Sequence, residues 1–186
     1  MPKLFAARNS EISSREKRNM ERARKVASQG MVLLENMGAL PIDKSVKTIA
    51  LFGNGARRTI KGGTGSGDVN SRFVVNVEQG LEDAGFELTT KAWMDTYNTQ
   101  VETARRGYFG ELQQEMAVKG MAAVMKILTE PFVEPAISGV SQEEIDAMKA
   151  DLAIYVLSRN SGEGKDRTPG AGDYELSDTE KTAIVN

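Results

Sequence analysis

Short apolar runs alternate with longer amphipathic stretches along most of the chain. Residues 48–52 (Thr-Ile-Ala-Leu-Phe) and 152–157 (Leu-Ala-Ile-Tyr-Val-Leu) are almost entirely apolar, and a polar loop that contains glycine follows each run. Apolar runs of this length, bounded by turn residues, are typical of buried strands. The run at 152–157 is the clearest of them. Residues 86–90 predict a further strand, so the pattern indicates about three strands.

The stretches between these runs repeat their apolar residues at helical spacing. Ser-x-x-Glu patterns at Ser141 and Ser177 predict capping boxes, in which a serine and the third residue after it close the first turn of a helix. The methionines of the long central stretch are interpreted as core-filling side chains. We expect helices from Ser13 or Ser14 to about Asn36, over 73–84, over 94–128, over 141–149, and from Ser177 onward.

The order of these elements indicates the fold class. A strand, a glycine-rich loop, a helix and a second strand form a βαβ unit, which places its two strands parallel. We therefore expect an α/β fold, a three-layer α/β/α sandwich around a mainly parallel sheet. About three strands are few for a sheet covered on both faces, and the last predicted helix has only begun at Asn186. The sheet is accordingly expected to be incomplete in this chain.

Charge and hydropathy narrow the class of protein. The formal net charge of -2 argues against a nucleic-acid partner or an anionic membrane. A basic cluster from Arg15 to Lys25 is interrupted by Glu16 and Glu21, so it is interpreted as the solvated face of a helix. No stretch approaches the roughly 20 apolar residues that span a bilayer, and no secretory signal is evident. The simplest interpretation is a soluble, cytoplasmic protein.

The chain contains neither cysteine nor histidine. Disulfides, thiolate nucleophiles, catalysis by a Ser-His-Asp triad and metal sites built on His or Cys are therefore excluded. Acid/base chemistry would fall to Asp, Glu, Lys or Tyr. We expect no metal and no cofactor.

Two polar loops that contain glycine follow predicted strands, and ligands of parallel α/β sheets bind beyond the carboxyl ends of the strands. The loop at 158–167 is rich in charge, and its Glu163 lies between two glycines. A carboxyl group there could act as a general acid if its surroundings raised its pKa. The alternative is a solvated loop with surface ion pairs, which periodicity alone favours.

The loop after residue 52 suggests a phosphate-binding site, but its pattern departs from the known motifs. No Gly-Lys-Ser/Thr follows, so it is not a P-loop. Gly53-Asn-Gly55-Ala-Arg-Arg58 also lacks the third glycine of G-x-G-x-x-G, because Arg58 stands there. The signal for nucleotide binding is therefore weak.

Four motifs, in the same order, resemble the second domain of family 3 glycoside hydrolases. The match begins at about Ala23, which leaves residues 1–22 as an N-terminal extension and the start of the first helix. Residues 94–135 add little to it. The four motifs are Ala23–Asn36 with Ala39-Leu-Pro41 close behind, Ile49-Ala-Leu-Phe-Gly53, Gly62-Gly-Thr-Gly-Ser-Gly-Asp-Val-Asn70, and Ser161-Gly-Glu-Gly-Lys-Asp-Arg167 followed by residues 172–178.

The resemblance implies a retaining β-glycosidase of the β-glucosidase or β-xylosidase type, acting on terminal β-linked sugars of glucosides or oligosaccharides. In that family an α/β sandwich packs against a (β/α)8-type barrel. The barrel supplies an Asp nucleophile, and the Ser-Gly-Glu-Gly loop supplies the acid/base, here Glu163. By the same resemblance, seven further residues are expected to bind substrate or shape the loops: Arg159, Ser161, Asp166, Arg167, Gly65, Ser66 and Asp68.

No barrel is expected within this chain, because such barrels take roughly 200 residues or more. We expect the barrel elsewhere in the same full-length chain, in an order that resembles permuted members of the family. The isolated piece is then expected to be inactive. Two alternatives remain: a stand-alone α/β module that binds carbohydrate or protein without catalysis, and a nucleotide-binding βαβ domain.

Overall fold

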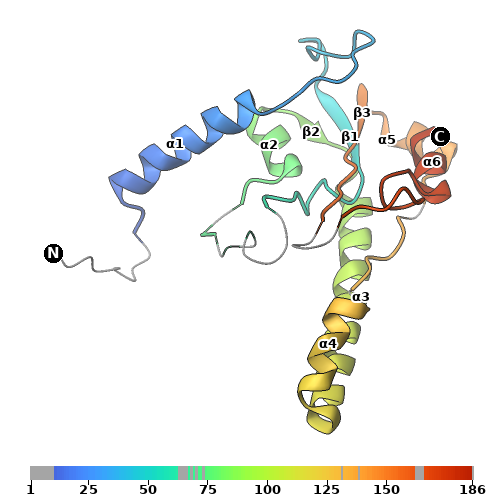
Figure 1. Cartoon of the computed structure of the whole chain (residues 1–186). Coiled ribbons are helices and arrows are strands. Elements are labelled where there is room, and N and C mark those ends of the chain that lie inside the picture. The colour runs from blue at the N-terminus through green and yellow to red at the C-terminus, as the bar shows by residue number, and fades with distance from the viewer. Residues whose placement is uncertain are drawn as a thin grey trace, which may run out of the picture. The chain divides into compact units, whose positions relative to one another are not determined.

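The computed structural model describes residues 11–62, 67, 69, 71–72, 74–130, 132–137, 139–161 and 166–185. The chain divides into two compact units, residues 1–43 and residues 44–186. The first unit holds α1 (Ser14–Gln29). The second unit holds β1 (Thr48–Phe52), α2 (Val77–Asp83), β2 (Glu87–Leu88), α3 (Lys91–Lys119), α4 (Met121–Thr129), α5 (Gln142–Met148), β3 (Leu152–Tyr155) and α6 (Asp178–Val185), as Figure 1 shows.

Helix α1 begins with a capping box and ends earlier than its sequence pattern predicts. The amide of Glu16 donates to the Ser13 hydroxyl at 3.2 Å, and the Glu16 carboxylate accepts from the Ser13 amide at 2.8 Å. The predicted extension to Asn36 is wrong, since Gly30 is the C-cap. Glycine is among the poorest helix formers, and it ends the helix although the apolar spacing continues. None of the residues of α1 is buried.

The sheet of the second unit is parallel, as the sequence predicts. Strand β1 lies in the centre, between β2 and β3, and both neighbours run parallel to it. Residues 152–157, interpreted as the clearest buried strand, do form a strand, but it is less buried than β1 and ends before residue 157. Four of the five residues of β1 are buried, whereas β3 ends at Tyr155 and is only partly buried. A central strand has neighbours on both sides, and β3 lies at the edge of the described sheet.

The two faces of β1 pack against different helices, because alternate side chains of a strand point in opposite directions. Ile49 and Leu51 pack with side chains of α2, and Ala50 and Phe52 pack with side chains of α5. Trp93, near the start of α3, packs against all three apolar clusters of the unit. The layers are therefore helix, sheet and helix, which confirms the predicted α/β/α sandwich.

The long helix predicted over 94–128 is divided in two at Gly120, which has a φ of +57°. Helices α3 and α4 lie side by side and extend away from the sheet (Figure 1). Met94, close to the sheet, is only 3% exposed. Met121 and Met125 are 78% and 55% exposed, so their interpretation as core residues is wrong. They lie on the part of the α3–α4 pair that extends beyond the sheet.

Beyond the strands, the pairing of β1 with β3 continues into both following loops. The Val156 amide donates to the Phe52 carbonyl at 2.8 Å, and the Gly55 amide donates to the Val156 carbonyl at 3.1 Å. The Asn54 side chain then binds both backbone groups of Ser158, accepting from its amide at 2.8 Å and donating to its carbonyl at 3.2 Å. The starts of the two loops are therefore held together at the carboxyl edge of the sheet.

The glycines of this turn are required by the neighbouring strand. A Cβ on Gly53, whose φ is +99°, would lie 2.2 Å from the Val156 carbonyl oxygen. A Cβ on Gly55 would lie 2.7 Å from a methyl carbon of Val156 and 2.9 Å from the Cβ of Ser158. Such contacts are too short for any side chain. Glycine at these positions allows the chain after β3 to approach closely. The Gly53-Asn-Gly55 pattern therefore has a structural reason that needs no bound phosphate.

Gly53→Ala is expected to destabilise the second unit strongly, and Gly85→Ala is its matched control. Both glycines have a positive φ, +99° and +93°, so each substitution adds about 1–3 kcal/mol of backbone strain. Only Gly53 also meets a neighbouring backbone, because a Cβ on Gly85 has no atom within 4 Å. Urea unfolding should show a loss for Gly53→Ala that exceeds the control by about 1–3 kcal/mol. Equal losses of unfolding free energy in the two variants would show that the close approach of Val156 does not require glycine at position 53.

Candidate functional site

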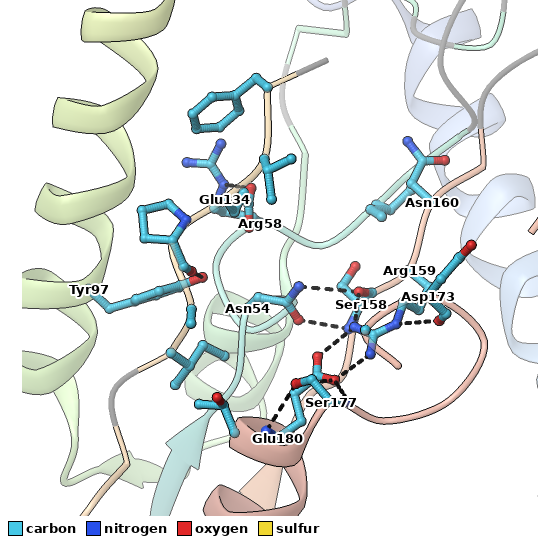
Figure 2. Close-up of a pocket in the computed structure, with 18 of the residues that line it drawn as sticks. Asn54, Arg58, Tyr97, Glu134, Ser158, Arg159, Asn160, Asp173, Ser177 and Glu180 are labelled. Carbon is cyan, nitrogen blue, oxygen red and sulfur yellow. Dashed lines mark hydrogen bonds and ion pairs between the residues drawn. The ribbon is translucent and has the colours of Figure 1, made fainter. Parts of the chain in front are cut away.

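A cleft of about 660 Å³ lies where the sequence predicts a site, beyond the carboxyl ends of β1 and β3. Its walls come from five parts of the chain: the loop after β1, Tyr97 of α3, residues 132–137, the loop after β3, and the start of α6. Figure 2 shows their labelled side chains converging on this space. The position agrees with the rule that ligands of open parallel sheets bind at this edge.

A bidentate ion pair joins the loop after β3 to α6. Both terminal nitrogens of Arg159 bind the Glu180 carboxylate, at 2.7 and 2.6 Å (Figure 2). The Arg159 Nε also donates to the carbonyl of Asp173 at 2.8 Å. The hydrogen bonds from Arg159 lower the pKa of Glu180 to about 2, and the same bonds raise the pKa of Arg159. Glu180 is thus held as a carboxylate, which suits a structural anchor and not a general acid.

Glu180 also completes the predicted capping box of α6. Its carboxylate accepts from the Ser177 amide at 2.8 Å, and its own amide donates to the Ser177 hydroxyl at 3.2 Å. One carboxylate therefore fixes the first turn of α6 and the guanidinium of Arg159 together. The helix start and the loop after β3 form one connected network.

A second arginine closes the same loop at its other end. Arg167 forms an ion pair with the Asp173 carboxylate at 2.8 Å and donates to the Asp173 carbonyl. The hydroxyl and amide of Thr168 donate to the other carboxylate oxygen at 2.7 and 2.6 Å, and these bonds lower the pKa of Asp173. Arg159 and Arg167 therefore converge on one carbonyl group, that of Asp173.

The opposite wall is built around Arg58, whose only distinction in the sequence is that it departs from a phosphate-binding motif. Its Nη1 binds Glu102 of α3 at 2.9 Å, and its Nε binds Glu134 at 2.9 Å. Tyr97 lies beside this pair (Figure 2) and donates to the Pro135 carbonyl at 3.3 Å. Burial raises the pKa of Tyr97 to about 12, so the phenol stays neutral.

The preceding residue, Arg57, turns away from this wall and ties the turn to two helices. It forms ion pairs with Glu78 of α2 and Asp95 of α3. The hydrogen bonds that Arg57 donates to the Glu78 carboxylate are the main cause that raises the pKa of Arg57. Two adjacent arginines directly after a glycine turn are the one sequence signal that could have revealed this wall.

The residues predicted from the sequence fall into three groups. Arg159 and Arg167 line the cleft. Ser161 and Asp166 are exposed and are not among the lining residues. Four predicted residues lie outside the described part of the chain: Glu163, Gly65, Ser66 and Asp68.

Among the described residues that line the cleft, the charged side chains balance one another. Three are arginines and three are carboxylates, and each of these arginines is bound to one of these carboxylates. A phosphate site would need an excess of positive charge or free backbone amides. The described side chains therefore do not favour the nucleotide-binding alternative.

Among the described residues, no group of three or more acidic side chains is placed to hold a metal ion. Within the same ranges, no helix combines the length and the apolar composition that crossing a membrane requires.

These features define an open α/β domain with a charge-balanced cleft at the carboxyl edge of its sheet. The family model described as the glycosyl hydrolase family 3 C-terminal domain matches residues 31–186, and the chain belongs to that family. The resemblance inferred from the four sequence motifs is therefore confirmed. The boundary expected near residue 22 stays a prediction.

Relatives and solved structures agree with this assignment. The chain is 32% identical to β-glucosidase A of Butyrivibrio fibrisolvens over 176 residues, which cover 94% of this chain and 19% of the relative. It is 33% identical to a β-glucosidase of Ruminococcus albus over 171 residues, which cover 89% and 16%. β-Glucosidase 3B of Thermotoga neapolitana, solved with α-D-glucose, matches with a TM-score of 0.66 and 32% identity, over 90% of this chain and 21% of its own. The chain thus spans about a fifth of the proteins it matches.

Glu180→Gln is expected to destabilise the protein in a manner that depends on pH. At neutral pH the loss of charged hydrogen bonds should lower the free energy of unfolding by about 2 kcal/mol. Because the folded-state pKa of Glu180 is lowered from 4.5 to about 2, its contribution is complete above 4.5 and disappears as pH falls toward 2. Urea unfolding should be measured at neutral pH and at several pH values between 4.5 and about 2. The free energies of unfolding of the variant and the wild type should become equal as the pH falls.

Glu144→Gln is the matched control for this experiment. Glu144 occupies the same capping-box position in α5, with Ser141 as its partner, and no arginine binds it among the described residues. Its substitution should cost clearly less than that of Glu180. Equal losses for the two variants would mean that the pair with Arg159 adds nothing to stability.

Proposed function

We propose that this chain supplies the general acid/base of a retaining β-glycosidase of the β-glucosidase or β-xylosidase type, and that Glu163 is that residue. The observation that carries the proposal is membership of the family together with the Ser161-Gly-Glu-Gly-Lys-Asp-Arg167 motif between β3 and α6. The β-glucosidases that the chain resembles support terminal β-linked glucosides or oligosaccharides as substrates. The nucleophile is an Asp of a barrel domain in the longer chain.

The anchoring of the loop supports this role. On one side of Glu163, Ser158 is bound by Asn54 and Arg159 is bound by Glu180. On the other side, Arg167 is bound by Asp173. Both ends of the segment are therefore fixed at the edge of the sheet where ligands bind. The roles that fit Arg159 and Arg167 are to position the loop, because their guanidinium groups are already engaged.

The same ion pairs suit a general acid. A free arginine beside a carboxyl group would lower the pKa of that group and keep it ionised. Here the positive charges of Arg159 and Arg167 are compensated by Glu180 and Asp173. Burial of Glu163 against the barrel can then raise its pKa without opposition from these two arginines.

The chemistry needs two carboxyl groups. Protonated Glu163 donates its proton to the glycosidic oxygen while the barrel Asp attacks the anomeric carbon and forms a glycosyl-enzyme ester. The Glu163 carboxylate then takes a proton from the water that attacks this ester, which releases the sugar and restores both groups. A single carboxyl group cannot act both as the nucleophile and as the general acid/base.

Glu163→Gln in the full-length protein is expected to separate an acid/base role from a structural one. For a β-glucoside with a poor leaving group, kcat/KM should fall by about 10²- to 10⁴-fold. For 2,4-dinitrophenyl β-glucoside, whose leaving group needs no proton, kcat/KM should change little while kcat falls. Azide, which needs no base, should restore kcat and yield the β-glycosyl azide. Equal losses of kcat/KM on both substrates would overturn the assignment. The control is Glu111→Gln, a substitution at an exposed position of α3 that should leave the kinetics unchanged.

The isolated 186-residue chain is expected to show no hydrolysis of aryl β-glucosides that depends on Glu163. It lacks the barrel nucleophile that the mechanism requires. The measurement compares release of p-nitrophenol by the chain and by its Glu163→Gln variant at high protein concentration. Release that disappears in the variant would show that the second carboxyl group lies within these residues.

A further inference from the structure

The wall of the cleft formed by Arg58 and Glu134 has no part in the mechanism above. Arg58 comes from the turn after β1, and Glu134 comes from residues 132–137. Their side chains are 21% and 32% exposed, so both are partly shielded from solvent but remain accessible. The pair faces the cleft beside Tyr97 (Figure 2).

The contacts of this pair leave one donor group of Arg58 and one acceptor atom of Glu134 available. Arg58 forms an ion pair with Glu134 through its Nε and a hydrogen bond with Glu102 through its Nη1, and its Nη2 has no hydrogen bond among the described residues. Glu134 makes its ion pair through Oε1, and its Oε2 has no hydrogen bond within the same residues. A carboxylate oxygen beside a guanidinium N–H can bind two neighbouring hydroxyl groups, one as donor and one as acceptor.

The remaining surface of the cleft indicates the class of ligand. Because three arginines are matched by three carboxylates among the described lining residues, these side chains offer no net charge to an anion. Ile60 and Val133 line it and are 41% and 79% exposed, which provides apolar contact close to the polar pair. A volume of about 660 Å³ lies within the usual range for small-ligand pockets. A neutral ring that carries hydroxyl groups on its rim and C–H groups on its faces matches these features.

We propose that Arg58 and Glu134 form a sugar-binding position, which holds a neutral saccharide unit of a β-linked oligosaccharide through two adjacent hydroxyl groups. The proposal rests on the proposed function for the choice of a β-linked oligosaccharide, and on the described residues for the position itself. Glu134 and Arg58 are binding residues in this proposal and take no part in proton transfer. An oligosaccharide should therefore gain affinity from this wall that an aryl monosaccharide does not.

The test is a titration of the 186-residue chain with cellobiose, followed by calorimetry and by shifts of backbone amide resonances. The folded wild-type chain should bind cellobiose saturably, with shifts at Arg58 and residues 132–137. Glu134→Gln should weaken binding by about tenfold or more, since a charged hydrogen bond is lost.

Glu102→Gln is the matched control for this experiment. Glu102 binds the same arginine at the same distance of 2.9 Å but does not line the cleft. Its substitution should leave the affinity for cellobiose unchanged, and urea unfolding of both variants verifies that each is folded.

Three outcomes would overturn the proposal. The first is an absence of saturable binding by the folded wild-type chain. The second is an equal loss of affinity in Glu134→Gln and Glu102→Gln, or no loss in either. The third is displacement of cellobiose by inorganic phosphate, which would show that the cleft prefers an anion.

Glu163→Gln distinguishes this proposal from the proposed function. Binding of cellobiose by the chain should be unchanged in that variant, because the proposal assigns binding to Arg58 and Glu134 and not to Glu163. If binding follows Glu134 while the kinetics show no acid/base role for Glu163, only the proposed function fails. If the kinetics assign Glu163 as acid/base and cellobiose does not bind at this wall, only the present inference fails.

Discussion

The close approach between the turn after β1 and the chain after β3 determines where both walls of the cleft begin. Glycine at Gly53 and Gly55 lets the backbone of Val156 come within a distance that no side chain would tolerate. Asn54 then binds both backbone groups of Ser158. Arg58 follows this contact by four residues and Arg159 follows it by one, so the positions of both arginines depend on it.

Each arginine extends this local contact to a segment that the sheet does not reach. Arg58 binds α3 and residues 132–137, and Arg159 binds the first turn of α6. These pairs are partly buried, so breaking one would leave a poorly solvated charge. The result is a cleft with fixed, compensated charges, which is suited to a neutral ligand with many hydroxyl groups. The glycine turn that resembles a phosphate-binding loop thus serves the packing of two strands.

Local signals in the sequence predict much of the fold. The strand at 48–52 and the capping boxes at Ser141 and Ser177 are each encoded within a few residues, and the structure contains all three. The end of α1 is not predicted correctly, because the apolar spacing continues past Gly30 although the helix does not. The break at Gly120 is a comparable case, since one glycine divides an otherwise regular helical pattern.

The candidate site depends on pairs that are distant in sequence, and such pairs leave no periodic signal. Glu180 was interpreted only as part of a helix cap, yet its strongest partner is Arg159, 21 residues earlier. Glu134 had no assigned role, and its partner Arg58 is 76 residues away. The motif between Ser161 and Arg167 was found through its resemblance to a family, and its Glu163 lies outside the described residues. The sequence therefore identifies the candidate acid/base residue, and the structure adds the ion pairs that build the walls of the cleft.

The central claim is that these residues form one half of a two-part active site. The most direct measurement is to read the gene on both sides of the codons for residues 1–186. The account predicts an uninterrupted frame that continues into a (β/α)8-type barrel with a candidate Asp nucleophile. A reading frame that encodes these 186 residues alone would contradict it.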